Sequence, residues 1–403
     1  MDKNELLKRT LKKQLYFAKK LSGADLSAGI EKSLPITMKL LTELIKDGEV
    51  VELGYAPSTG GRRPMLYTLQ KDVYFILTVA MDQLFTRIGI MDMEHKFVAP
   101  VERIELPLAD NPGALRQLAG LIEDYITRSG IEKSKIAGLG IGMPGFIDVK
   151  KGINYSFLDT PGSNVVDYLE QQLMLPVHID NDSSLIALAE LKFGAARNKR
   201  NVMVVNISWG VGLGLLLNGE LFRGQNGFAG EFSHIPVFST DKLCSCGKTG
   251  CLETEASLLV VVQKALKGIR EGRVSSFHDI ASKNQEEACE AIIRAAVNGD
   301  KFCIEVLSEV GYNIGKGVAI LIHILNPELI VLSGRGTTAG KLWRTPIQQA
   351  LNEHCIPRLA ENTEIEISTL GLQAELLGAA ALVMENFDKD KKKKNQQLQT
   401  TSS

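Results

Sequence analysis

Apolar segments of strand length alternate with amphipathic helical segments over most of this chain. From residue 73 onward, short uninterrupted apolar runs are followed by longer segments with apolar residues at helical spacing. Strands are predicted at 73–91 (a hairpin), 136–142, 177–180, 202–218 (a second hairpin), 329–333 and 365–368, and helices at 114–129, 183–193, 256–270, 285–297, 302–325 and 374–386. Strands that alternate with helices indicate an α/β fold, and the hairpin pattern that starts again after residue 200 indicates two similar lobes.

Helical spacing near the N-terminus predicts three short helices. Leucines recur at this spacing within residues 4–20, and Ser22 is placed to cap a second helix over 23–30. A third helix has Ser33 as its cap and Pro35 in its first turn, where the missing N–H of proline costs nothing. The core face predicted for this helix consists of Leu41, Leu44 and Ile45.

Two extended segments come after these helices. They cover residues 49–53 and 66–69, and they flank the basic loop GYAPSTGGRRP, which indicates a wing. Three helices and a wing in this order are typical of a winged helix-turn-helix that binds DNA, with Thr37 and Lys39 pointing outward. The alternative for the helices is that three short helices are common in proteins and do not by themselves indicate DNA binding. The alternative for GRRP is that it is only a linker. The predicted DNA contacts are Pro35, Ile36, Thr37, Lys39, Arg62 and Arg63.

Charge is unevenly distributed along the chain. Residues 1–70 contain 12 Lys or Arg and 8 Asp or Glu, a net +4, whereas the rest contains 34 and 39, a net −5, which sums to −1. A basic N-terminal module suits nucleic acid, and a chance imbalance of solvated charge is the alternative. No apolar run approaches the ~18 residues of a membrane helix, and the N-terminus lacks the apolar region of a secretory signal. We therefore expect a cytoplasmic globular protein.

One histidine and three of the six cysteines gather in the segment FAGEFSHIPVFSTDKLCSCGKTGCLE. His234 precedes Cys244, Cys246 and Cys251, which have the spacing C-x-C-x4-C. Thiolates and imidazole are the ligands that tetrahedral zinc selects, and four of them leave no open position for water. The segment therefore predicts a structural zinc site. Free cysteines in a glycine-rich loop are the alternative.

The same segment resembles the ROK family of repressors, open reading frames and sugar kinases. The resemblance rests on G-E-x-x-H followed by C-x-C-G-x-x-G-C-x-E, with Ser233 in place of the family's usual glycine before the histidine. It implies an actin-like, ribonuclease-H-like body with a ligand cleft between two lobes. It also implies a zinc ion that fixes the loop while His234 turns its other nitrogen to a sugar hydroxyl. The N-terminal residues resemble the DNA-binding half of the family's repressors, whereas the family's sugar kinases resemble only the residues after this N-terminal module.

A candidate sugar site accompanies the predicted metal. Asn181 and Asp182 match the N-D pair that binds sugar in the family's kinases, where the aspartate is the general base. Glu231 and Glu253 bracket the metal ligands, and such a polar cluster can accept several sugar hydroxyls while rejecting analogues that leave it unpaired. For Asp182 alone, a helix cap is the alternative. The predicted effector-binding residues are Gly145, Asn181, Asp182, Glu231, His234 and Glu253.

Two segments resemble loops that contact phosphates in the family's kinases, but residues that contact the phosphates there are replaced here. The motif D-x-G-G-T falls at residues 80–84, where Ala80 replaces the aspartate and Asp82 replaces a glycine. In the loop that resembles G-T-G-x-G-x-G, Trp209 replaces the threonine, and tight turns between strands account for the remaining glycines. Arg335 intrudes into the segment that resembles the adenosine-side loop. We expect no bound nucleotide and no kinase activity.

The sequence thus predicts a sugar-responsive transcriptional repressor in four parts. They are a winged helix-turn-helix with linker (1–70), a first lobe (71–196), a second lobe with the zinc loop and a final helix that returns to the first lobe (197–387), and a disordered basic tail (388–403). The expected partners are operator DNA, a sugar or sugar phosphate, and further copies in a homodimer or dimer of dimers, but no membrane. The alternatives are an ATP-dependent sugar kinase and a regulator controlled by a protein partner.

Overall fold

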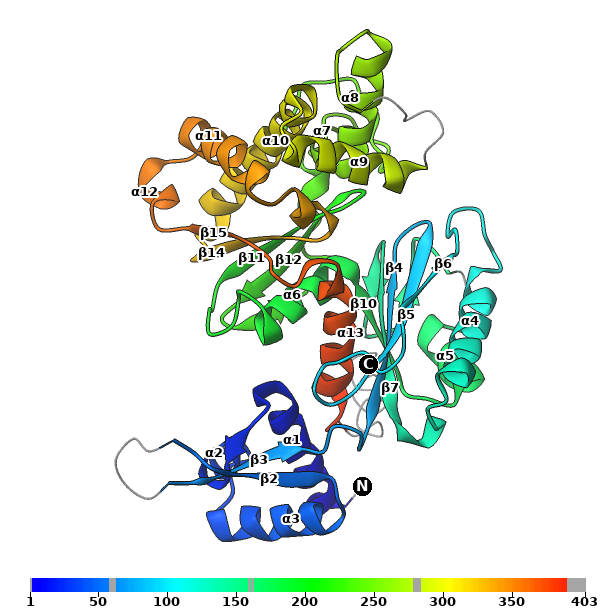
Figure 1. The fold of residues 1–403 in the computed structure, drawn as a ribbon, viewed down its shortest axis with the longest axis vertical. Coiled ribbons are helices and arrows are strands. Elements are labelled where there is room, and N and C mark those ends of the chain that lie inside the picture. The colour runs from blue at the N-terminus through cyan, green and yellow to red at the C-terminus, as the bar shows by residue number, and fades with distance from the viewer. Residues whose placement is uncertain (1, 58–62, 159, 161–162, 278–283, 390–403) are drawn as a thin grey trace, which may run out of the picture. The chain divides into compact units, whose positions relative to one another are not determined.

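The computed structural model describes residues 2–57, 63–158, 160, 163–277 and 284–389. By its internal contacts the chain forms two units (Figure 1). The first unit consists of Met1–Asp180 and Ala379–Ser403, and the second consists of Asn181–Gly378. The predicted basic tail lies outside the described residues except for Asp388 and Lys389. No described helix combines the length and apolarity needed to cross a membrane.

The N-terminal module, residues 2–69, is a small bundle closed by a sheet. Its elements are α1 (Lys3–Ala18), β1 (Leu21–Ser22), α2 (Gly23–Gly29), α3 (Leu34–Lys46), β2 (Val50–Tyr55) and β3 (Met65–Leu69), with strand order β1-β3-β2. Leucines of all three helices are buried together, among them Leu11, Leu26 and Leu41. Ser22 and Asp25 form a reciprocal capping box at the start of α2, which confirms the predicted cap. Ser33 precedes α3 as predicted, but its side chain makes no capping bond.

The first unit also contains a five-stranded sheet in the order β10-β7-β4-β5-β6. The strands are β4 (Phe75–Met81), β5 (Phe85–Met91), β6 (Glu102–Glu105), β7 (Ile136–Met143) and β10 (Val177–Asn181). Helices α4 (Ala114–Ser129) and α5 (Val165–Leu173) contribute apolar residues to the same core as the sheet, and a small hairpin of β8 (Ile147–Asp148) and β9 (Ile153–Asn154) comes after β7. Helix α4 ends at Gly130, whose φ of 70° places it in the left-handed region suited to glycine.

The second unit repeats this sheet topology. Its strands are β11 (Val202–Ile207), β12 (Val211–Leu217), β13 (Glu220–Phe222), β14 (Leu329–Ser333) and β15 (Glu364–Ile367), in the order β13-β12-β11-β14-β15. In each unit the first three strands form an antiparallel meander, and the fourth strand pairs in parallel with the first. The repetition confirms the two similar α/β lobes predicted from the sequence.

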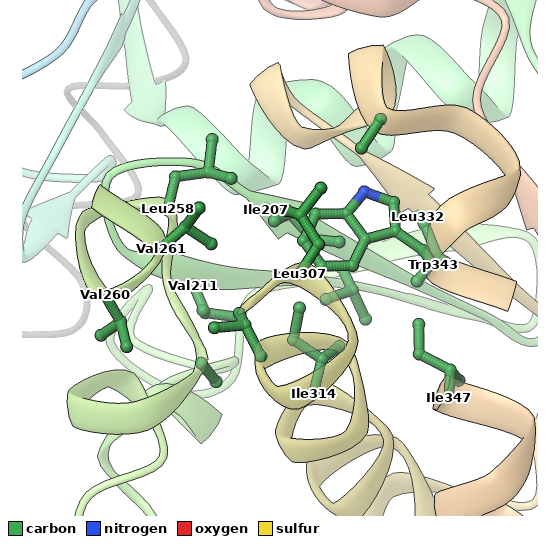
Figure 2. Close-up of a cluster of buried hydrophobic side chains, with 14 of the residues drawn as sticks. Ile207, Val211, Leu258, Val260, Val261, Leu307, Ile314, Leu332, Trp343 and Ile347 are labelled. Atoms are coloured by element: carbon green, nitrogen blue, oxygen red, sulfur yellow. The ribbon is translucent and has the colours of Figure 1, made fainter. Parts of the chain in front are cut away.

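Helices pack an apolar layer against the second sheet (Figure 2). They are α7 (Glu253–Ala256), α8 (Leu258–Arg270), α9 (Gln285–Val297), α10 (Lys301–Leu325), α11 (Arg344–His354) and α12 (Pro357–Ala360), and 3-10 turns cover Phe232–His234 and Arg335–Trp343. Trp343 is fully buried in this layer, where its indole N–H donates to the carbonyl of Gly336 at 2.7 Å. The predicted helix 256–270 corresponds to α8, which begins two residues later because Ser257 caps it through the N–H of Val260.

Some elements carry no prediction from the sequence. Helices α5 and α11 are the longest of these, and α11 begins within a polar stretch that contains Pro346. Proline is compatible with the first turn of a helix, so the residue that suggests a break lies where it does no harm. The burial of Ile347 and Leu351 against α10 then stabilises the helix.

The last helix, α13 (Ala374–Asn386), belongs partly to each unit, because the division falls between Gly378 and Ala379. It continues without interruption through that point. Helix α6 (Asp182–Phe193) lies in the second unit and begins directly after β10. Helix α6 therefore begins at the division between the units, and helix α13 crosses it.

Candidate functional site

The four predicted metal ligands lie together in the second unit. His234 is in the 3-10 turn after β13, and Cys244, Cys246 and Cys251 lie in the next loop; the donor atoms of all four are within 4.8 Å of one another. The distance from Cys244 Sγ to His234 Nδ1 is 3.5 Å, and that from Cys246 Sγ to Cys251 Sγ is 3.6 Å. With bonds of about 2.3 Å to sulfur and about 2.0 Å to nitrogen, tetrahedral zinc separates its ligands by about 3.5–3.8 Å. The donor set and the spacing therefore fit such an ion.

Backbone geometry brings these ligands together. Gly247 and Gly250 have φ of 80° and 77°, which glycine adopts without strain. A side chain at Gly250 would also place its Cβ 2.2 Å from the carbonyl oxygen of Phe238. The N–H of Cys244 donates to the carbonyl of Lys248 at 2.8 Å, which closes the tight turn that carries Cys246. The glycines thus allow the tight turn, and the turn brings the cysteine side chains together.

Carboxylates gather near Glu231, which lies beside His234. The Nε2 of His234 lies 3.7 Å from Glu231 Oε2, while Nδ1 faces Cys244. Burial raises the pKa of Glu231; His234 opposes this effect, and the charges of Asp182 and Glu253 add to it. Because like charges are held close together, this cluster favours a ligand that donates hydrogen bonds, as hydroxyl groups do.

Glu253 is fixed by its neighbours. Ser245, between Cys244 and Cys246, donates to Glu253 Oε1 at 3.4 Å. A Cβ at Gly210 would lie 2.7 Å from Glu253 Oε2, so a side chain at that position would displace the carboxylate. Sequence reasoning did not single out Ser245, and it treated Gly210 only as a glycine of the second loop; nothing in the sequence indicated that either residue contacts Glu253.

Asn181 and Asp182 lie at the start of α6. Asn181 Oδ1 accepts from the N–H groups of Ser183 and Ser184 at 2.9 and 3.3 Å, so Asn181 is the helix cap. The cap considered for Asp182 thus falls one residue earlier, and Asp182 is the first helical residue. Asp182 Oδ1 also accepts from Ser183 Oγ at 3.1 Å. The structure brings Asp182 and Glu253 within electrostatic reach of Glu231.

Gly145 belongs to the first unit, in the loop after β7. Its φ is 95°, and a Cβ there would lie 2.5 Å from Ser156 Cβ. The local turn alone therefore requires glycine. Its role beside a ligand stays a prediction.

The segments that resemble phosphate loops contain side chains that are buried or bonded. Ala80 is buried within β4, and Asp82 Oδ1 accepts from the N–H groups of Leu84 and Phe85, each at 2.8 Å. The carboxylate thus occupies backbone donors in the turn of the β4–β5 hairpin. In the second unit, the Arg335 guanidinium lies 5.4 Å from the ring centroid of Trp209 and pairs with Glu286.

The glycines after Trp209 have a different cause from the predicted one. A Cβ at Gly212 would lie 2.0 Å from Ser183 Oγ, and a Cβ at Gly214 would lie 2.3 Å from Ala187 Cβ. Both glycines lie within β12, so close packing of that strand against α6 requires them. The expectation of tight turns between strands was wrong for these two positions.

The predicted DNA contacts separate into two groups. Pro35, Ile36 and Lys39 are exposed at the N-terminal end of α3, as expected, and Arg63 is exposed. Thr37 was expected to point outward, but it is fully buried, and its hydroxyl donates to the carbonyl of Ser33 at 3.2 Å. The helix phase places Thr37 with Leu40 and Leu41 on the core face. Arg62 lies outside the described residues.

The family model described as "ROK family" matches residues 86–386, well over half of the 403 residues. The chain belongs to the ROK family. Among ROK relatives, the xylose repressor of Caldicellulosiruptor bescii is 32% identical over 400 residues, which cover 96% of this chain and 98% of that protein. The glucokinase of Halalkalibacterium halodurans is 34% identical over 294 residues, 71% of this chain and 88% of the relative.

A solved structure agrees with the fold. The ROK family transcriptional regulator described as a homologue of the Escherichia coli MLC protein has a TM-score of 0.76 at 24% identity, and 96% of each chain is covered. At this identity the likeness concerns the fold alone. It includes the ROK body and extends over nearly the whole chain.

Proposed function

We propose that this ROK protein is a sugar-responsive DNA-binding transcriptional regulator that acts as a repressor. One observation carries the proposal. The similarity to a xylose repressor extends over 96% of the chain, whereas the similarity to a glucokinase covers 71%. A protein that only phosphorylates sugar has no need of the extra N-terminal module.

The N-terminal module is proposed to bind operator DNA. The exposed end of α3 presents Ile36 and Lys39 to the major groove, and the wing supplies Arg62 and Arg63 to phosphates or the minor groove. A symmetric operator requires two modules, so we propose a homodimer or a dimer of dimers. The basic balance of residues 1–70 supports this partner.

The carboxylate cluster is proposed to bind the sugar. Asp182, Glu231 and Glu253 supply acceptors for hydroxyl groups, and Asn181 supplies an amide. A zinc ion bound by His234, Cys244, Cys246 and Cys251 would cross-link the loop that carries two of these carboxylates. His234 is then held through Nδ1, and its Nε2 is directed toward Glu231 and the ligand.

We further propose that kinase activity has been lost. Phosphoryl transfer depends on positioning phosphates and neutralising their charge. Here Ala80 offers no carboxylate, Asp82 places a negative charge on the hairpin donors, and Trp209 and Arg335 form a packed contact where the loops resemble nucleotide-binding ones. Asp182, which matches the kinase base, is proposed to bind the sugar without transferring a phosphate to it.

Fluorescence anisotropy tests the proposal. The purified protein is titrated onto DNA from upstream of its own operon, at stated salt, with D-xylose, D-glucose, N-acetyl-D-glucosamine and their phosphates. Specific binding that one compound relieves is the expected result. Binding that no compound alters would point to a protein partner instead, and sugar-dependent ADP release without specific DNA binding would establish the kinase alternative.

A further inference from the structure

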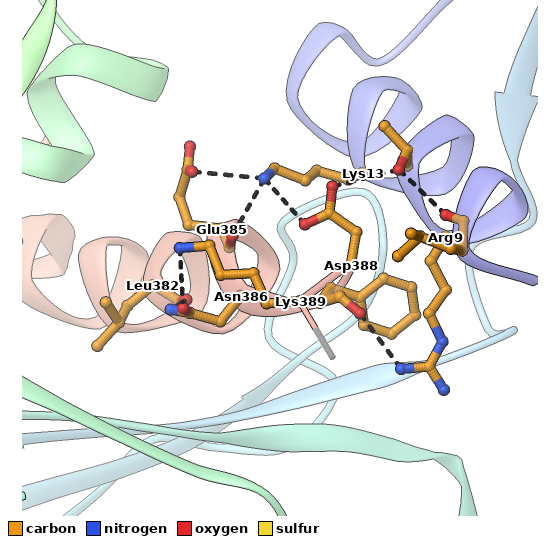
Figure 3. A network of polar contacts seen from close by, with 10 residues as sticks. Arg9, Lys13, Leu382, Glu385, Asn386, Asp388 and Lys389 are labelled. Carbon is orange, nitrogen blue, oxygen red and sulfur yellow. Dashed lines mark hydrogen bonds and ion pairs between the residues drawn. The ribbon is translucent and has the colours of Figure 1, made fainter. Parts of the chain in front are cut away.

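Helix α1 of the N-terminal module is bonded to the end of α13 (Figure 3). Lys13 Nζ lies 3.1 Å from the carbonyl oxygen of Glu385, 3.5 Å from Glu385 Oε2 and 3.2 Å from Asp388 Oδ1. Arg9 donates to the carbonyl of Phe387 at 3.3 Å, and Thr10 donates to Asp388 Oδ2 at 3.3 Å. We call this set of six residues the α1–α13 junction.

The chemistry of the junction suits a helix end. The last carbonyls of an α-helix have no partner within the helix and carry partial negative charge, so cations are favoured there. Lys13 and Arg9 supply those cations from a different helix. The side chains of Lys13, Glu385 and Asp388 retain only 21%, 29% and 17% of their exposure, so water screens these ion pairs less than pairs on an open surface.

A buried lysine extends the junction inward. Lys12 is 3% exposed, and its Nζ lies 2.8 Å from Glu49 Oε2 and 3.1 Å from the Tyr74 hydroxyl. The rings of Tyr74 and Phe387 pack edge to face with centroids 5.7 Å apart, and Lys12 Nζ lies 5.6 Å from the centroid of Phe387. The ammonium thus contacts the N-terminal module, the segment before β4 and the residue after α13. Its charge is paired, as burial requires.

The other half of α13 is held by α6. A Cβ at Gly378 would lie 2.0 Å from the carbonyl oxygen of Leu185, so the two helices touch through their backbones. The next residue of α13 is Ala379, and a Cβ at Gly140 would lie 2.1 Å from its carbonyl oxygen. Helix α13 therefore packs just as closely against β7. Leu185 comes three residues after Asp182, nearly one helical turn. Close backbone contacts leave no soft side chains to absorb a shift of α6.

We propose that α13 and the α1–α13 junction transmit the state of the sugar site to the DNA-binding module. The path runs from Asp182 through α6 to Gly378, along α13 to Glu385, and across to Lys13 on α1. Each step is an uninterrupted helix or a contact between backbones or charged groups. The inference rests on the proposed function, because it assigns a route to the sugar response of that same site.

The test compares operator affinity with and without sugar in matched variants. The wild-type ratio of the two dissociation constants is expected to be at least about 5, the lower end of typical allosteric coupling. The double variant K13Q/D388N removes the ion pairs of the junction, and its ratio should fall to about 1–2, with sugar affinity unchanged by calorimetry. The control is K8Q, which removes the same charge from the same helix; Lys8 pairs with Glu43 and Asp47 inside the N-terminal module.

A second variant shows whether K13Q/D388N loses the sugar response only because it misfolds. The variant K13R keeps a cation beside Asp388 and beside the carbonyl and carboxylate of Glu385, and it should retain most of the wild-type ratio. Hydrogen exchange across α1 should also respond to sugar in the wild type and not in K13Q/D388N. A full ratio in K13Q/D388N, or an equal loss in K8Q, would overturn the inference while leaving the regulator intact. A wild-type protein that binds no operator, or that no sugar releases, would overturn both.

Discussion

Acidification should loosen α1 from the first lobe through His95. This residue lies in the turn after β5, where its Nε2 donates to the carbonyl of Tyr16 at 3.1 Å and its ring lies 4.4 Å from the ring of Tyr16. Burial, and secondarily the charge of Lys19, lowers the pKa of His95 to about 4. The bond to Tyr16 opposes this effect only in part. Docked α1 therefore requires a neutral imidazole.

Proton linkage gives the sign and the size of the change in stability of docked α1 with pH. When α1 detaches, His95 returns to a pKa near 6.5, so the detached state binds the proton more readily than the docked state. The stability of the docked state is thus fully present above about pH 6.5 and is lost as the pH falls toward 4. The complete difference corresponds to about 3 kcal/mol, of which about 2 kcal/mol is lost at about pH 5.

Hydrogen exchange of the α1 amides measures this loss. The free energy of opening, corrected for the intrinsic exchange rate, should fall by about 2 kcal/mol between about pH 7.5 and about pH 5 in the wild type. In the variant His95→Gln, whose amide can still donate to the Tyr16 carbonyl, the fall should nearly vanish. Direct titration of the His95 ring by NMR checks the pKa itself. An equal pH dependence in both proteins would refute the reasoning.

Four further substitutions test the assigned roles. Cys246→Ser should lower bound zinc well below stoichiometry in metal analysis, and an unchanged content would contradict the ligand set. Glu231→Ala should abolish release by sugar while operator affinity stays as in the wild type; release that persists would exclude the site. Lys39→Ala should weaken operator binding and reduce the slope of log K against log salt by about 0.9, so an equal slope would exclude a phosphate contact. Thr37→Val should cost about 1 kcal/mol of stability in urea unfolding and leave sequence preference unchanged, because its hydroxyl is buried and bonds the carbonyl of Ser33, just before α3.

The corrections have a common physical origin. On a helix each residue turns the side chain by about 100°, so a small error in phase exchanges an exposed position for a buried one. Thr37 lies between exposed Ile36 and half-buried Met38, and its polarity gave no indication of the core position it occupies. The glycines of β12 show the same limit. Their spacing is visible in the sequence, but the α6 residues that pack on them, Ser183 and Ala187, lie almost 30 residues earlier in the chain.

The sequence by itself determined the repeated α/β lobes, the N-terminal helices with the two strands that follow them, and the gathering of His234 with three cysteines in one segment. These features depend on hydrophobic periodicity or on short spacings such as that of Cys244 and Cys246, and both are local properties of the chain. Only the tertiary structure decided that Asn181 caps α6, that Arg335 packs on Trp209, and that Lys13 reaches Glu385. Such contacts join residues that are distant along the chain, and no local pattern specifies which distant helix end a lysine will meet.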